Sequence, residues 1–231
     1  MGCGAVRKLR SCACPRIRRR VFIEHLFDDP ARWATHAGIV VASIVLHELG
    51  HGLVATWQGD PTPRIRGHIT WNPVVHMGWL ALGLVAFFGI GFGRTPVTPA
   101  YFRNRRWGET LVALAGPGVN LLLATVAAAT IVLLLRVGDA DPRSYAIRFW
   151  DWVLFLNTLL FLFNLIPLPP FDGFHALEGA FDLGNLGTTL RALGWYPMIL
   201  AFVLASTPAF GAAVRDLSEG LVRLFALILA G

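Results

Sequence analysis

The chain has 231 residues, of which 55% are hydrophobic and only 15% charged, and its mean hydropathy is +0.58. A soluble domain carries roughly 25% charged residues, so the composition argues against a soluble protein and for a single membrane unit. The net charge of +6 comes from the N-terminus, because residues 1–20 contain seven basic residues and no acid. Basic residues confined to such an arm argue against nucleic-acid binding and favour a tail near anionic lipid.

This basic arm also holds all three cysteines, Cys3, Cys12 and Cys14. The rest of the chain therefore has no disulfide to place. The Cys12-Ala-Cys14 pair could bind a metal or carry an acyl chain, but a disordered tail explains it as well, and we favour that interpretation. The role of the arm stays open.

Three apolar stretches reach the length of about 20 residues that a transmembrane helix needs. They are Ala37–Trp57, Leu111–Leu135 and Trp150–Leu168. Leu193–Val214 is expected to be a fourth span, although two prolines interrupt it. The apolar tail from Leu221 onward is either an interfacial helix or the end of a longer broken one. The expected fold is an α-helical polytopic membrane protein, with three transmembrane helices as its core.

The segment between the first two spans has a different composition. Residues 60–76 are rich in proline, glycine and β-branched residues, which is typical of a loop or a short strand. Residues 77–93 read MGWLALGLVAFFGIGFG, an apolar run with five glycines that is too short for a good single-pass helix. A short strand or a re-entrant segment is therefore expected here.

The first span contains the sequence His47-Glu48-Leu49-Gly50-His51. Positions i and i+4 of a helix share one face, so His47 and His51 can bind the same metal ion. Glu48 can then act as the general base for a water molecule. The alternative is an accidental motif, but polar groups in an apolar span are costly unless a shared partner compensates them. The pattern predicts a catalytic zinc site.

A catalytic zinc site needs a third protein ligand and one open position. The best candidate is Asp172, in the sequence NLIPLPPFDG that ends the third span. Prolines stop the helix just before Asp172, and Gly173 permits an unusual backbone turn. Alone, Asp172 would be interpreted as a surface residue after a helix end; beside His47 and His51, we favour a ligand.

Three blocks of this sequence resemble the site-2 proteases, a family of intramembrane zinc metalloproteases. The blocks are HELGH in the first span, AGPGVN (Ala115–Asn120) at the start of the second, and NLIPLPPFDG at the end of the third. The likeness covers about Ala37–Leu177 and is closest to the compact bacterial branch. Many relatives carry a PDZ domain between these blocks, but residues 120–157 are too few for one.

The resemblance implies one zinc ion per chain, bound by His47, His51 and Asp172. It implies that Glu48 is the catalytic base and that Asn164 helps to bind or polarise the substrate. Asn157 lies seven residues before Asn164, on about the same face, and either assists it or bonds a neighbouring helix. We include Asn157 and Asn120 as candidates for substrate binding.

The resemblance also has a departure at His76. Related sequences tend to have an acidic residue soon after this histidine, whereas this chain has Met77 and Gly78. We therefore interpret His76 as structural or gating rather than as a metal ligand.

The implied activity is hydrolysis of peptide bonds in membrane-embedded substrates, such as a single-pass membrane protein or a signal-peptide-like segment. The alternative is a metal-binding membrane protein without protease activity, such as a metal carrier or scaffold. A carrier needs ligands along a path through several spans, and this chain has one such cluster. The expected organisation is a basic arm (1–35), an intramembrane metalloprotease core (36–185) and C-terminal membrane helices (186–231). The sequence does not indicate an oligomeric state.

The proposed site also constrains the topology. His51 and Asp172 must meet, so the first and third spans end toward the same face of the bilayer, where the second span begins. Residues 58–110 then start and finish on one side, and residues 77–93 must enter and return as a re-entrant hairpin or stay at the surface. That placement makes them a candidate lid or substrate gate. Six arginines on this face favour a cytoplasmic orientation in a bacterial cell membrane, although the basic arm disagrees.

Overall fold

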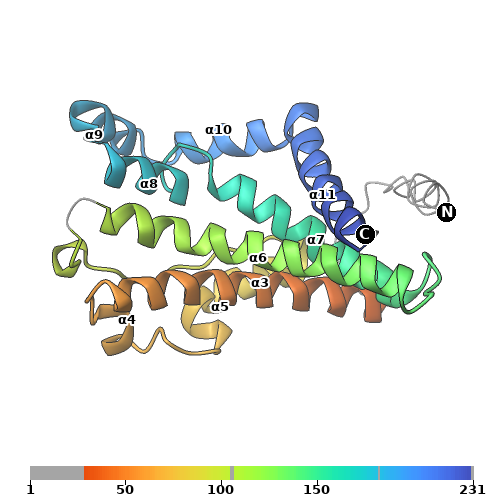
Figure 1. The fold of residues 1–231 in the computed structure, drawn as a ribbon. Coiled ribbons are helices and arrows are strands. Elements are labelled where there is room, and N and C mark those ends of the chain that lie inside the picture. Colours follow the sequence, from red (N-terminus) through yellow and green to blue (C-terminus); the bar gives the residue numbers. More distant parts are fainter. Residues whose placement is uncertain (1–28, 105–106, 182, 230–231) are drawn as a thin grey trace.

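The computed structural model describes residues 29–104, 107–181 and 183–229 (Figure 1). Most of the predicted basic arm, with its three cysteines, lies outside these residues. The described part contains helices and loops and no β-strand, and three of its helices are long and apolar enough to cross a membrane. They are α3 (Pro30–Trp57), α6 (Gly108–Arg136) and α7 (Tyr145–Asn164). The predicted helical membrane fold with a core of three spans is confirmed.

Local signals in the sequence set the ends of these helices. The Asp29 carboxylate accepts a hydrogen bond from the Arg32 amide at 3.0 Å, and Pro30 occupies the first turn of α3. Ser144 caps α7 in the same way by accepting from the Ile147 amide. Because α3 begins at Pro30, the boundary between arm and core that the sequence suggested falls inside this helix.

Small residues bring the spanning helices close together. Ala124, Ala127 and Ala128 of α6 are fully buried and pack with Leu154 of α7 in one apolar cluster. At Gly50 of α3, a Cβ atom would lie 2.8 Å from a methyl group of Val119 and 3.1 Å from the Ala115 carbonyl oxygen, both on α6. Small residues give close backbone approach in lipid, where no hydrophobic force drives helices together. The central helix α6 therefore contacts both α3 and α7.

The segment between α3 and α6 contains the short helix α4 (Thr62–Ile65) and the longer α5 (Pro73–Phe88). The short strand expected within residues 60–76 is thus replaced by a helical turn, a loop and the start of α5. Each of these two helices has a proline in its first turn, which fits this outcome. Proline fixes φ at a helical value, and the amide hydrogen that it lacks would have no partner within the helix at that position.

The predicted hairpin is present in this segment. The indole nitrogen of Trp33, near the start of α3, donates to the Ala86 carbonyl at 3.0 Å, so α5 runs back along α3. Residues 89–98 then return, and the Arg94 amide donates to the His76 carbonyl at 3.0 Å. At the end of this returning segment, the Thr98 amide donates a hydrogen bond to the Asp60 carboxylate at 2.6 Å. Residues 73–98 therefore run along α3 and come back instead of continuing in one direction.

The C-terminal part consists of α8 (Asp172–Ala180), α9 (Gly184–Ala192), α10 (Tyr196–Ala205) and α11 (Pro208–Ile228). The stretch Leu193–Val214, expected as a fourth span interrupted by two prolines, is divided by a break before Pro208 that separates α10 from α11. Helices α9 and α10 are bent by 88° relative to each other. The apolar tail is the end of the longer helix α11, the second of the two alternatives for it.

The ends of the helices place the predicted site residues together. In Figure 1, the C-terminal end of α3, the beginning of α6, the end of α7 and helix α8 all lie in the left-hand half of the molecule. This is the arrangement that contact between His51 and Asp172 requires.

The hairpin makes a prediction for membrane topology. Single cysteines at the exposed positions Arg66, Arg103 and Gly138, in a protein lacking the native cysteines, can be probed in membranes with an impermeant thiol reagent. Positions 66 and 103 should label from the same side and position 138 from the opposite side. Labelling of 66 and 103 from opposite sides would mean that residues 73–98 cross the bilayer.

Candidate active site

The two histidines of the first span and the aspartate of α8 converge at one point. His47 Nε2 lies 3.0 Å from His51 Nε2 and 3.1 Å from Asp172 Oδ2, and His51 Nε2 lies 3.4 Å from Asp172 Oδ1. A tetrahedral zinc with bonds of about 2.0–2.1 Å separates its ligand atoms by roughly 3.3 Å. Among the described residues, these side chains form the one group of three or more that could hold a metal ion.

The outer nitrogen of each histidine shows which ring atom carries the proton. His51 Nδ1 lies 2.7 Å from the Val112 carbonyl oxygen, and His47 Nδ1 lies 2.6 Å from the amide oxygen of Asn120. Both partners are acceptors, so both Nδ1 atoms donate, and in the neutral rings both Nε2 atoms present lone pairs. Each Nε2 therefore has the form that binds a metal.

The centre of the group consequently contains hydrogen-bond acceptors without donors. Two imidazole lone pairs and a carboxylate face one another, and the buried Oδ2 atom of Asp172 has no hydrogen-bond partner. A cation is the partner that all three groups can share, and these residues therefore fit a divalent metal.

Two glycines allow this convergence. A Cβ atom at Gly116 of α6 would collide with the Nε2 atoms of both His47 and His51. At Gly173, a Cβ atom would collide with the Leu165 carbonyl group at the end of α7. Gly116 leaves room at the ligand atoms. Gly173 lets the start of α8 pack closely against the end of α7, so that Asp172 reaches the two histidines.

The side chain of Glu48 is buried and held by the hairpin. Thr95 Oγ1 lies 2.8 Å from Glu48 Oε2 and 3.0 Å from the Glu48 carbonyl oxygen, so its single hydrogen is shared between two acceptors. The returning chain is so close that a Cβ atom at Gly93 would lie 2.6 Å from Glu48 Oε1. The hairpin thus borders the predicted base, as the sequence suggested.

Asn120 and Asn157 have a different environment from the one predicted. Both side chains are fully buried, and Asn120 Nδ2 donates to Asn157 Oδ1 at 2.9 Å while its own oxygen accepts from His47. Neither amide is exposed to a substrate in this structure. Asn120 therefore contacts the predicted metal ligand His47, and Asn157 contacts Asn120; a role of either residue in substrate binding stays a prediction.

The remaining predicted residues lie apart from this network. Asn164 is partly buried at the end of α7 and donates one amide hydrogen to the Leu160 carbonyl at 2.9 Å. His76 is buried, and its Nε2 bonds the Thr70 carbonyl at 2.8 Å, which suits a structural residue of the hairpin. Its ring contacts that of His68 at 5.6 Å, and burial together with His76 lowers the pKa of His68.

Comparison with known proteins identifies the family. The profile of Peptidase family M50 matches residues 35–139 and 136–205, which is most of the chain. The chain belongs to peptidase family M50. The resemblance to site-2 proteases that the sequence carries is thereby confirmed, and with it the class of enzyme.

Individual relatives agree with this assignment. YwhC of Bacillus subtilis is 34% identical over 173 residues, which cover 73% of this chain and 78% of that protein. Rip2 of Mycolicibacterium smegmatis is 35% identical over 178 residues, covering 72% of this chain and 64% of that protein. Both are named as candidate zinc metalloproteases. The chain spans less than two thirds of the length of Rip2, and no solved structure matches it significantly.

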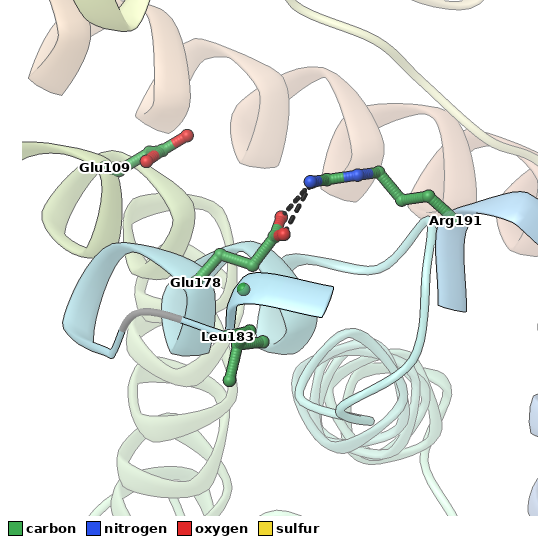
Figure 2. A pocket seen from close by; sticks show the side chains of 5 residues that line it. Glu109, Glu178, Leu183 and Arg191 are labelled. Carbon is green, nitrogen blue, oxygen red and sulfur yellow. Dashed lines mark hydrogen bonds and ion pairs between the residues drawn. The ribbon is translucent and has the colours of Figure 1, made fainter. Parts of the chain in front are cut away.

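A cavity of about 270 Å³ lies between α6, α8 and α9 of this M50 peptidase (Figure 2). It is bordered by Glu109 at the start of α6, by Glu178 of α8 and by Arg191 of α9. Arg191 Nη1 donates to Glu178 Oε2 at 2.6 Å, so the ion pair joins α9 to the helix that begins with Asp172. Because Arg191 is half exposed, this pair contributes at most about 1 kcal/mol to stability.

Sequence reasoning missed Thr95, Gly116 and Ser43, which all contact the site or its hydrogen-bond network. Gly116 lies inside the AGPGVN block, so its position could have been suspected. Thr95 and Ser43 carry no such signal, because a hydroxyl in a loop or in an apolar helix usually bonds the nearby backbone.

Gly116 gives a test of the ligand geometry. Gly116→Ala should abolish stoichiometric zinc binding, because the added methyl group would occupy the space of the two Nε2 atoms. Gly118→Ala is the matched control, since nothing lies within 4 Å of a Cβ atom there. Zinc content can be measured by mass spectrometry on protein purified in detergent. Full zinc occupancy in Gly116→Ala would contradict this geometry.

Proposed function

We propose that this M50 peptidase is an intramembrane zinc endopeptidase, which hydrolyses peptide bonds of membrane-embedded substrates. The observation that carries the proposal is the convergence of His47, His51 and Asp172 beside Glu48, within helices apolar enough to span a bilayer. Two imidazoles and one carboxylate form the ligand set of a catalytic zinc with a fourth position open. The names of the relatives as zinc metalloproteases support the same metal.

The chemistry divides between the metal and the side chains. Bound zinc supplies Lewis acidity, which polarises a carbonyl and makes a water molecule acidic enough to react near neutral pH. Glu48 Oε1 takes the proton of the attacking water, while Thr95 holds Oε2. Glu48 then delivers the proton to the leaving amine, so the peptide bond ends as a carboxylate and an ammonium group. Asn164 keeps one amide hydrogen that can polarise the scissile carbonyl.

We infer that the substrate is a single-pass membrane protein or a signal-peptide-like segment. The first ligand pair and the base are buried in a helix whose flanks are apolar. A substrate that reaches them from lipid is helical, and its carbonyls are already hydrogen-bonded within the helix. It must therefore unwind locally, and helix-weakening residues near the cut would favour cleavage.

The proposed location is a bacterial cell membrane, with the site nearer the cytoplasmic face. Arginines cluster in the segments at the end of the molecule that holds the ligands, and the positive-inside rule assigns such segments to the cytoplasm. These residues are Arg64, Arg66, Arg94 and Arg103. A metal carrier or scaffold has less support, because the described residues contain a single ligand group and not a path of them.

Substitution of Glu48 separates binding from hydrolysis. Glu48→Gln should retain zinc, since Glu48 is not in the ligand group, and should lose activity by about 10²–10⁴-fold, the usual contribution of a general base. Cleavage of a model single-pass peptide in liposomes measures the rate, and metal analysis measures the zinc. Wild-type cleavage by this variant would exclude Glu48 as the base.

Asp172→Asn should impair both zinc binding and hydrolysis. The amide cannot replace the ionised carboxylate, so zinc content and cleavage should fall together. Glu219→Gln on α11 is the control for loss of a carboxylate away from the site, since Glu219 is exposed and pairs with Arg223. Retention of a full zinc complement by Asp172→Asn would remove Asp172 from the ligand set.

Thr95 gives a further test of how the base is held. Thr95→Val keeps the shape but removes the hydroxyl, and a hydrogen bond to a charged group contributes about 1.5–3 kcal/mol. If that orientation matters in the transition state, kcat should fall by roughly tenfold or more. Thr95→Ser retains the hydroxyl and should restore most of the rate. Equal rates for the valine and serine variants would show that the hydroxyl does not position Glu48.

A further inference from the structure

A buried chain of hydrogen bonds connects α7 to the first metal ligand through α6. Asn157 Nδ2 lies 2.9 Å from the Val153 carbonyl oxygen and 3.1 Å from Ser43 Oγ. Asn157 Oδ1 accepts from Asn120 Nδ2 at 2.9 Å, and Asn120 Oδ1 accepts from His47 Nδ1 at 2.6 Å. Both asparagines are fully buried, so no water contact competes with these bonds.

The direction of this chain is fixed at its far end. A backbone carbonyl can only accept, so Asn157 must turn its NH₂ group toward Val153. Its oxygen then faces Asn120, which must donate with its own NH₂ group. The Asn120 oxygen is left facing His47, so Nδ1 of His47 must carry the proton and Nε2 must present a lone pair.

We propose that Asn157 is a positioning residue that sets the metal-binding tautomer of His47 through Asn120. This inference rests on the proposed metal site at His47, His51 and Asp172. Metal ligands commonly depend on such a bond to the second ring nitrogen, and its loss typically lowers metal affinity by about 10–100-fold. Here the acceptor is an amide whose orientation depends on another helix, so Asn157 acts without touching the ligand.

Zinc affinity measured by chelator competition tests the proposal without any peptide substrate. Asn120→Leu removes the acceptor and should weaken zinc binding by about 10–100-fold. Asn157→Leu should weaken it by at least about tenfold, because Asn120 can then turn its NH₂ group toward His47. Ser43→Ala should stay close to wild type, since the Val153 carbonyl still fixes the direction. Asn157→Ala removes the amide with less crowding and serves as the second variant.

Thr158→Val is the matched control for disturbance of α7. Thr158 adjoins Asn157 and is also fully buried, but it bonds the Leu154 carbonyl at 2.8 Å and Ser218 of α11 at 3.2 Å, not the network. This variant should bind zinc as the wild type does. The visible spectrum of cobalt-substituted protein should change in Asn157→Leu and remain unchanged in Thr158→Val.

The decisive experiment is rescue of zinc affinity by a second substitution. Aspartate at position 120 has two acceptor oxygens, so its contact with His47 no longer depends on which way an amide turns. Asn120→Asp should therefore restore zinc affinity in the Asn157→Leu background, whereas Asn157→Leu should add no further loss to Asn120→Leu. Wild-type zinc affinity in both Asn157 variants, or failure of Asn120→Asp to restore it, would overturn the proposal. Either result leaves the cleavage test of Glu48 unaffected, so the two failures are distinguishable.

Discussion

The structure depends on bringing three acceptor atoms together inside an apolar bundle. Two imidazole lone pairs and a carboxylate, all within 4.8 Å of one another, repel unless a cation lies among them. The surrounding residues make this convergence possible. The carbonyl and amide acceptors fix the histidine tautomers, and Gly116 leaves room at the ligand atoms. Gly173 lets α8 pack closely against the end of α7. The ligand group therefore explains why polar side chains occur in this apolar span.

Helix α6 connects this group to the rest of the molecule. Its first half approaches α3 at Gly50 and faces the histidines with Gly116, while its second half packs against α7 through fully buried alanines. Asn120 lies between these two halves and bonds both neighbours. One helix thus sets the distance between the histidine-bearing span and the span that leads to Asp172.

The sequence predicted those parts of the site that follow from local spacing. The i, i+4 histidines, the adjacent glutamate and the aspartate after a proline-terminated helix all lie where that spacing places them, and the need for His51 to meet Asp172 was enough to predict the hairpin. A bond from Asn157 to a neighbouring helix was one of the two predicted alternatives, whereas the contact of Asn120 with His47 was not predicted, because burial of an amide depends on which helix covers it. In the C-terminal part, Pro208 marked an interruption of the apolar run, but the sequence did not show that the run divides there into two separate helices.

The hairpin has a consequence for how activity can be altered. The ligands are positioned by α3, α6 and α8. The carboxylate of Glu48 is instead held by Thr95, which lies on the returning segment of the hairpin. The predicted metal ligands and the predicted base are therefore held by separate elements. A change in the lipid surroundings, or a partner that shifts residues 73–98, would disturb the position of Glu48 and leave the metal ligands in place. In the proposed mechanism, the enzyme would then be inactive with its metal still bound, and it would not have to acquire the metal again to regain activity.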